Sequence, residues 1–328
     1  MSETVAEFMQ KPVKKYACGS KAQKAKKTLV NAFTASEKGK KDDETALFKK
    51  ILDTVMKTEK GRETLTALSD FGYSFAFEKG DFGGFCDPDN KKILLNPSVP
   101  FDYMLRVIVH EGTHAIQSSL EKPGAPFDTE MQAASFLRKN RAIEADAVAH
   151  EMAFAYECRD VIPDVYKNAE EQNLPMFRAY AGEMEKSGDE KKAMQASFAA
   201  WYECAFYRDY YDKYHNENFA AWCDIFKKDK MKGAVSKEYP AEDVIKICRY
   251  KGESYMSPDF LNKGLAFSIT EEGRKTITDA LRGYAEAVGE KPDTSLSAMR
   301  IRSPEGVLLP ENKAVKAAVV ARAKQEGR

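Results

Sequence analysis

Two histidines stand four residues apart in the segment His110-Glu-Gly-Thr-His114. On an α-helix this spacing displaces the second imidazole by one turn, so both side chains can reach a single ion. Glu111 lies beside the first histidine, where its carboxylate can reach a water molecule on the ion without binding the ion itself. The pattern therefore predicts a metal site with His110 and His114 as ligands and Glu111 as the catalytic general base.

The segments around the motif favour a helix that follows a short strand. Lys92–Asn96 is an apolar strand that Pro97 and Pro100 end, and apolar residues then recur at helical spacing from Met104 to Ile116. Another strand is predicted over Tyr73–Phe77, and the sequence between the two strands is rich in turn residues. The motif is thus expected on an amphipathic helix beside a small sheet.

A catalytic zinc ion usually has three protein ligands and keeps one position open for water. A third histidine six residues after the motif is excluded, because Leu120 stands there. The better candidate is Glu144, on the long helix expected from about residue 129 to 160, and Glu130 near the start of that helix is the alternative. The prediction is one Zn2+ ion held by His110, His114 and Glu144.

Helical geometry sorts the other polar residues near Glu144. Glu151 falls on the same helix face as Glu144. It either supports the ligands or is a solvated charge, and we favour the solvated charge. Asp146 and His150 point away from that face and, spaced four apart, are expected to contact each other. No spacing rule selects a hydrogen-bond donor for the tetrahedral intermediate among the candidates His215, Tyr202, Tyr207, Tyr211 and Tyr255.

The composition excludes some classes of partner. Lys and Arg together number 51, as do Asp and Glu, so a formal net charge of zero gives no general attraction to nucleic acid or to an anionic membrane. No long apolar stretch or apolar leader is present, and the six cysteines form no C-x-x-C pair. We expect a cytoplasmic protein that acts on a peptide or protein, with an oligomeric state that the sequence does not specify.

The chain divides into three regions by pattern. Residues 1–42 are basic and are expected to form a mobile arm with one short helix, residues 43–160 carry the strands and the motif, and residues 161–328 are expected to be helical. Ser257 and Thr270 are expected to start helices, and a last helix is expected from about residue 312. The fold class is α+β and predominantly helical, with the last region capping the cleft.

The segments around the motif resemble the zincin metallopeptidases whose third ligand is a glutamate. Residues 61–62, 73–77, 83–90, 93–97, 110–117 and 144–147 together are similar to a group of uncharacterised bacterial metallopeptidases. The resemblance implies a zincin-like core, zinc ligation by His110, His114 and Glu144, and the base role for Glu111. It also implies that Lys92–Asn96 is the sheet edge to which an extended substrate adds.

Three functions stay open at this point. The first is a zinc-dependent peptidase of general specificity. A weaker similarity to small bacterial metallopeptidases that cleave repressors would make the substrate one regulatory protein. The third is a zincin-like binding or effector protein without turnover, which the large helical region favours.

Overall fold

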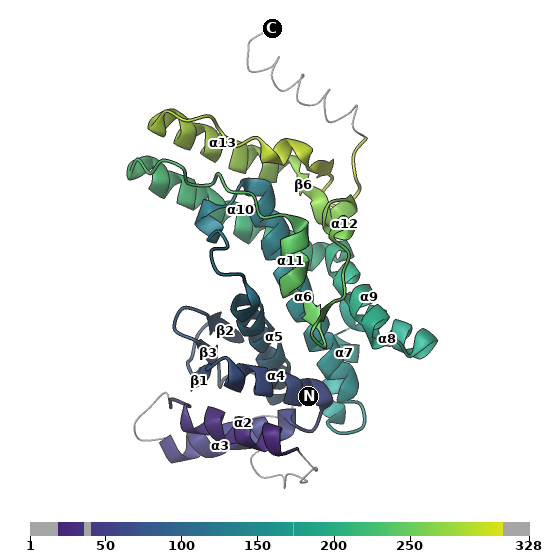
Figure 1. The fold of residues 1–328 in the computed structure, drawn as a ribbon. Coiled ribbons are helices and arrows are strands. Elements are labelled where there is room, and N and C mark those ends of the chain that lie inside the picture. The colour runs from purple at the N-terminus through teal and green to yellow at the C-terminus, as the bar shows by residue number, and fades with distance from the viewer. Residues whose placement is uncertain (1–18, 36–40, 173, 311–328) are drawn as a thin grey trace. The chain divides into compact units, whose positions relative to one another are not determined.

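The computed structural model describes residues 19–35, 41–172 and 174–310, and the chain forms two compact units (Figure 1). The first contains Met1–Glu121 and Ala145–Ala200, and the second contains Lys122–Glu144 and Trp201–Arg328. Each unit thus combines segments that are distant along the chain. The three regions expected from the sequence pattern, with boundaries after residues 42 and 160, stay a prediction. Within the described ranges, no helix has the length and apolar character needed to cross a bilayer.

Helices make up most of the first unit. They are α2 (Ser20–Asn31), α3 (Lys41–Val55), α4 (Glu59–Asp70), α5 (Phe101–Leu120), the second half of α6 (Ala133–Glu157), α7 (Pro163–Glu171), α8 (Pro175–Ser187) and most of α9 (Glu190–Glu203). Helix α2 buries Ala22, Ala25 and Leu29 and packs against α4. It is the one short helix expected in the basic region, and its small apolar stripe lies against α4. The mobility expected of residues 1–42 stays a prediction. Residues 1–18 lie outside the described part.

A three-stranded sheet lies in the first unit. Strands β1 (Ser74–Phe77) and β3 (Lys92–Leu95) match the two predicted strands, and β2 (Gly84–Asp87) lies in the segment expected to consist of turns. The order is β1-β3-β2, with β1 parallel and β2 antiparallel to β3. The expectation that the strand before the motif helix forms the edge is thus wrong. The chain reverses after β2, so β3 pairs on both sides and β2 becomes an edge.

One face of the sheet is covered by helices. Phe75, Phe77, Ile93 and Leu95 alternate along β1 and β3 and are almost fully buried on that face. The ring of Phe48 from α3 lies 5.2 Å from that of Phe75. Since Gly84 and Cys86 pair with Leu95 and Ile93, they share this face, which α5 also covers. Alternation therefore points two residues of β2 toward the motif helix.

The second unit begins with η2 (Asp128–Glu130) and the first half of α6. Its other elements are α10 (Ala205–Lys228), α11 (Ala241–Ile247), β4 (Arg249–Tyr250), β5 (Glu253–Ser254), α12 (Pro258–Leu261), η3 (Gly264–Phe267), β6 (Ser268–Thr270), α13 (Glu271–Val288), η4 (Ser295–Ala298) and β7 (Arg300–Arg302). Helices α10 and α13 pack together. Ser257 and Thr270 cap α12 and α13, which confirms both predicted helix starts. The helix expected from residue 312 lies outside the described residues.

Candidate metal centre

Helix α5 carries both histidines of the motif. Their Nε2 atoms are 3.2 Å apart, and the two rings meet edge to face with centroids 4.9 Å apart. The apolar stripe of α5, including Leu105, Ile108 and Val109, is buried, and this fixes which way the histidines face. The predicted i, i+4 pair therefore directs both Nε2 atoms to one point.

Glu144 comes from α6, one unbroken helix of 25 residues. It directly precedes Ala145, where α6 enters the first unit. Ligand atoms of His110, His114 and Glu144 all lie within 4.8 Å of one another, and all three side chains are partly buried. The structure thus brings together the three residues that the sequence selected.

A chain of hydrogen bonds sets the tautomer of His114. Gln117 donates from Nε2 to Asp146 Oδ2 at 2.7 Å, which turns its carbonyl Oε1 toward His114 Nδ1 at 3.0 Å. A carbonyl only accepts, so Nδ1 of His114 carries the proton and Nε2 keeps its lone pair. Asp146 also lies 3.5 Å from His150 Nε2, which confirms the expected contact along the helix.

His110 is oriented by an acidic partner. Its Nδ1 lies 3.3 Å from Glu151 Oε2, and Arg106 Nη1 lies 3.3 Å from the other carboxylate oxygen. Burial alone would raise the pKa of Glu151, but the hydrogen bond from His110 and the charge of Arg106 outweigh burial and lower it. An ionised Glu151 accepts a hydrogen bond from the Nδ1–H group of His110, so Nε2 of His110 also presents a lone pair.

These features fit a zinc ion. Two nitrogens bound to tetrahedral zinc at about 2.0–2.1 Å are separated by roughly 3.3–3.4 Å, close to the observed 3.2 Å between the Nε2 atoms. Two lone pairs that face each other at this distance repel unless a cation lies between them. The outer partners Gln117 and Glu151 are of the kind that commonly orient ligating histidines. His110, His114 and Glu144 would hold the ion.

Glu111 lies under strand β2. A Cβ atom added to Gly84 would lie 2.9 Å from Glu111 Cγ and 2.4 Å from Val107 Cγ1, so only glycine allows the strand to approach α5 this closely. Cys86 follows on the same face of β2, where burial, with the charge of Glu111 second, raises the pKa of its thiol to about 12. The side chain of Glu111 thus packs where the motif helix meets an edge strand.

Replacing Gly84 with alanine tests this close approach. We expect Gly84→Ala to destabilise the fold by about 1–3 kcal/mol, because β2 or the Glu111 side chain must move. Gly182→Ala on α8 is the control, since its added methyl group meets nothing within 4 Å and a helical alanine is favoured by up to about 1 kcal/mol. Urea unfolding measures both variants. Equal stability of Gly84→Ala and the parent chain would contradict the packing argument.

Glu130, the alternative third ligand, is not part of this cluster. Glu130 lies in η2, where its carboxylate binds Lys237 Nζ at 2.8 Å. Glu151 was favoured as a solvated charge, and this is wrong because its side chain is only 12% exposed and contacts His110. The helix begins at Ala133 instead of residue 129, so Glu130 precedes it.

Sequence reasoning missed Gln117 and Arg106. Gln117 stands three residues after His114 on the same helix, a spacing that places two side chains side by side and could have identified it. Arg106 is 1% exposed, and its Nη2 atom donates to Asn168 and Gln172 at 3.1 and 2.8 Å. Nothing in the local pattern signals Arg106, because its partners Glu151, Asn168 and Gln172 lie at least 45 residues away.

Five residues are candidates for the hydrogen-bond donor to the tetrahedral intermediate, and their surroundings do not distinguish them. Tyr202 and Tyr255 are buried, and Tyr207 and Tyr211 are partly buried. His215 is 5% exposed and lies on α10, with its ring against those of Phe136, Tyr211 and Tyr214. No contact in the described part of the chain selects one of the five.

Burial of His215 predicts a pH-dependent stability. Burial is the main cause that lowers its pKa, ahead of the charges of Glu144, Arg141, Asp212 and Asp128, which act in opposing directions. The unfolded chain takes up this proton near pH 6.5, whereas the folded chain does so at lower pH. The neutral imidazole therefore makes its full contribution to the free energy of unfolding above about pH 6.5. This contribution is lost as the pH falls through the lowered pKa.

Thermal unfolding of the metal-free chain from pH 7.5 to 5 should show this decrease in stability with falling pH, and His215→Gln should reduce the decrease. Equal slopes would contradict the assignment.

The chain is mostly helical with a small sheet, and His110, His114 and Glu144 together are the donor set of a metal-binding centre. Residues 22–249 match the family described as "Putative metallopeptidase family (DUF6782)". The chain belongs to this family, and the family description implies a metal ion and a peptide or protein substrate. No curated protein and no solved structure matches the chain.

Proposed function

We propose that this protein is a zinc-dependent peptidase in which His110, His114 and Glu144 hold the metal and Glu111 is the general base. The observation that carries the proposal is the pair of Nε2 atoms 3.2 Å apart, each oriented by a buried partner on its Nδ1 side. Bound zinc supplies Lewis acidity, which lowers the pKa of water and polarises a peptide carbonyl.

The chain's own residues then move the proton. Glu111 accepts a proton from the attacking water while the oxygen–carbon bond forms. It returns that proton to the amide nitrogen as the carbon–nitrogen bond breaks, so a carboxylic acid and an amine result. Gln117 and Glu151 keep both imidazoles in the tautomer that binds metal.

The open edge of β2 supports an extended peptide as substrate. In the described part of the chain no strand pairs with its outer side, whereas Thr34 bridges to the outer side of β1. Asn96 donates to Gly83, so alternation directs the backbone groups of Gly84 and Cys86 away from β3. A peptide that adds to these groups would lie next to Glu111.

Metal removal tests the proposed activity. We expect the purified chain to contain one zinc ion and to cleave unstructured peptides at internal bonds. A chelator should abolish cleavage, and zinc added back should restore it. A chain that binds zinc stoichiometrically but cleaves no peptide in a broad library would reject the peptidase proposal and leave a binding function.

A further inference from the structure

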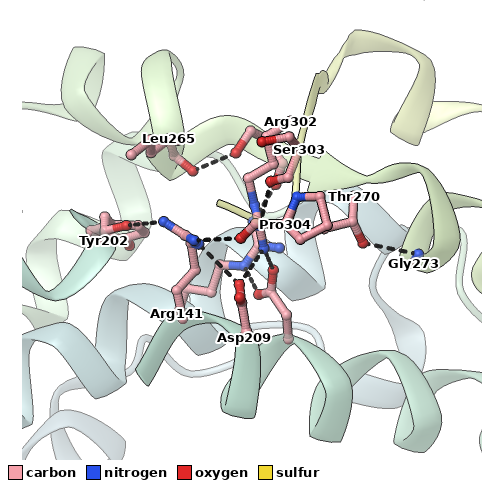
Figure 2. Close-up of polar contacts among 12 residues, drawn as sticks. Arg141, Tyr202, Asp209, Leu265, Thr270, Gly273, Arg302, Ser303 and Pro304 are labelled. Atoms are coloured by element: carbon pink, nitrogen blue, oxygen red, sulfur yellow. Dashed lines mark hydrogen bonds and ion pairs between the residues drawn. The ribbon is translucent and has the colours of Figure 1, made fainter. Parts of the chain in front are cut away.

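A buried ionic cluster holds the turn of α6 just before Glu144. Arg141 donates from Nε to Asp212 Oδ1 at 2.6 Å and from Nη1 to the carbonyl oxygen of Ser268 at 2.7 Å. Asp212, on α10, also accepts a hydrogen bond from Arg302 of β7 at 2.5 Å. Figure 2 shows Arg141 and Arg302 converging over α10. These bonds fix Arg141, which precedes Glu144 by about one helical turn.

The cluster has a surplus of positive charge. Among the described residues, the ion pairs of Arg141, Arg208 and Arg302 involve two carboxylates, Asp209 and Asp212. All three arginines are at most 2% exposed. A buried charge without a counterpart is costly. Glu144 stands three residues after Arg141 on α6, a spacing at which side chains are neighbours. Glu144 therefore adds a negative charge next to Arg141 on the same helix.

The ion pair between Arg141 and Asp212 places His215 on the part of α10 near Glu144. His215 follows Asp212 by three residues on α10, just as Glu144 follows Arg141 by three residues on α6, and Arg141 and Asp212 form the pair between the helices. Glu144 is also the nearby charge that acts most strongly on His215. In the described part of the chain, the buried Nε2 atom of His215 makes no hydrogen bond. A donor is thus available where a ligating carboxylate needs an outer partner.

We propose that Asp212 and His215 are positioning residues for Glu144. Asp212 anchors the preceding turn of α6 through Arg141, and His215 Nε2 would donate a hydrogen bond to the carboxylate when Glu144 binds the metal. Two residues of α10 would then determine how tightly Glu144 binds the metal. Residues 161–328, in which the sequence shows no motif, would thus contribute to metal binding. The inference rests on the metal ligation proposed above, but not on peptide hydrolysis.

Zinc affinity of full-length variants tests the proposal. Competition with a chromophoric chelator should show about 10- to 100-fold weaker binding for Asp212→Asn and for His215→Gln. The matched control is Glu217→Gln, whose side chain on α10 is 64% exposed and which should bind zinc like the parent chain. Glu144→Gln gives the reference for complete loss of the third ligand.

Cobalt substitution separates positioning from general destabilisation. The visible absorption of bound Co2+ depends on its ligands, so the spectra of both α10 variants should shift toward that of Glu144→Gln. His215→Gln leaves the ion pairs intact and decides the question if Asp212→Asn does not fold. A folded His215→Gln with parental zinc affinity and cobalt spectrum overturns the proposal, while the peptidase function stands. A parent chain that binds no metal overturns both.

Discussion

Glu111→Gln is expected to lower peptide hydrolysis by about 10²- to 10⁴-fold, the usual contribution of a general base. The amide has the shape of the carboxylate but cannot take a proton from water at neutral pH. Glutamine keeps the same Cγ atom against β2, so the packing of Gly84 and Val107 is preserved. Zinc content and thermal stability should therefore match those of the parent chain, measured by metal analysis and thermal unfolding.

A matched substitution controls for the loss of a negative charge. Glu63→Gln removes a carboxylate from α4, outside the metal-binding group, and should leave the rate unchanged. A zinc-loaded Glu111→Gln chain that hydrolyses peptides at the parental rate would remove Glu111 from the mechanism. The same inactive variant, if it retains bound substrate, would identify the natural peptide by mass spectrometry.

His114→Gln is expected to abolish stoichiometric zinc binding. Structural zinc sites with four ligands bind with about 10–16 kcal/mol, or roughly 2.5–4 kcal/mol per ligand. Loss of one ligand thus weakens binding by roughly 10²- to 10³-fold. Hydrolysis should fall in parallel, because Glu111 alone has no polarised carbonyl or activated water to act on. Metal analysis after gel filtration measures the loss.

His150→Gln is the matched control for this ligand. His150 is a buried histidine on α6 that contacts Asp146 and is not in the metal-binding group. Glutamine can still donate a hydrogen bond to Asp146, so this variant should keep one zinc ion per chain. Equal zinc loss in the two variants would mean that His150 is a ligand and that the assigned ligand set is incorrect.

The sequence predicted the elements whose signal is local. The i, i+4 histidines and the apolar stripe of α5 lie on one helix, so a single periodicity describes both. β1 and β3 consist mostly of apolar residues and were found within one residue of their ends. The i, i+4 contact between Asp146 and His150 follows from the same helical geometry.

The features that were missed depend on contacts between distant segments. β2 reads as a turn because glycine and aspartate occupy its ends, and it forms a strand through pairing with β3 and close packing on α5. The role of Glu151 depends on Arg106, which lies 45 positions earlier on another helix. The cluster around Asp212 joins α6, α10 and β7, and no local pattern could indicate that these elements meet.

Helix α6 carries Glu144, Asp146 and Glu151 on a single rigid backbone. Their angular offsets are set by 100° per residue, so none of the three can shift along the chain independently. Deleting one residue between positions 146 and 151 would keep the composition of the helix but rotate Glu151 by about 100° away from His110. Along this stretch, relatives of the protein should therefore tolerate substitutions far more readily than changes in length.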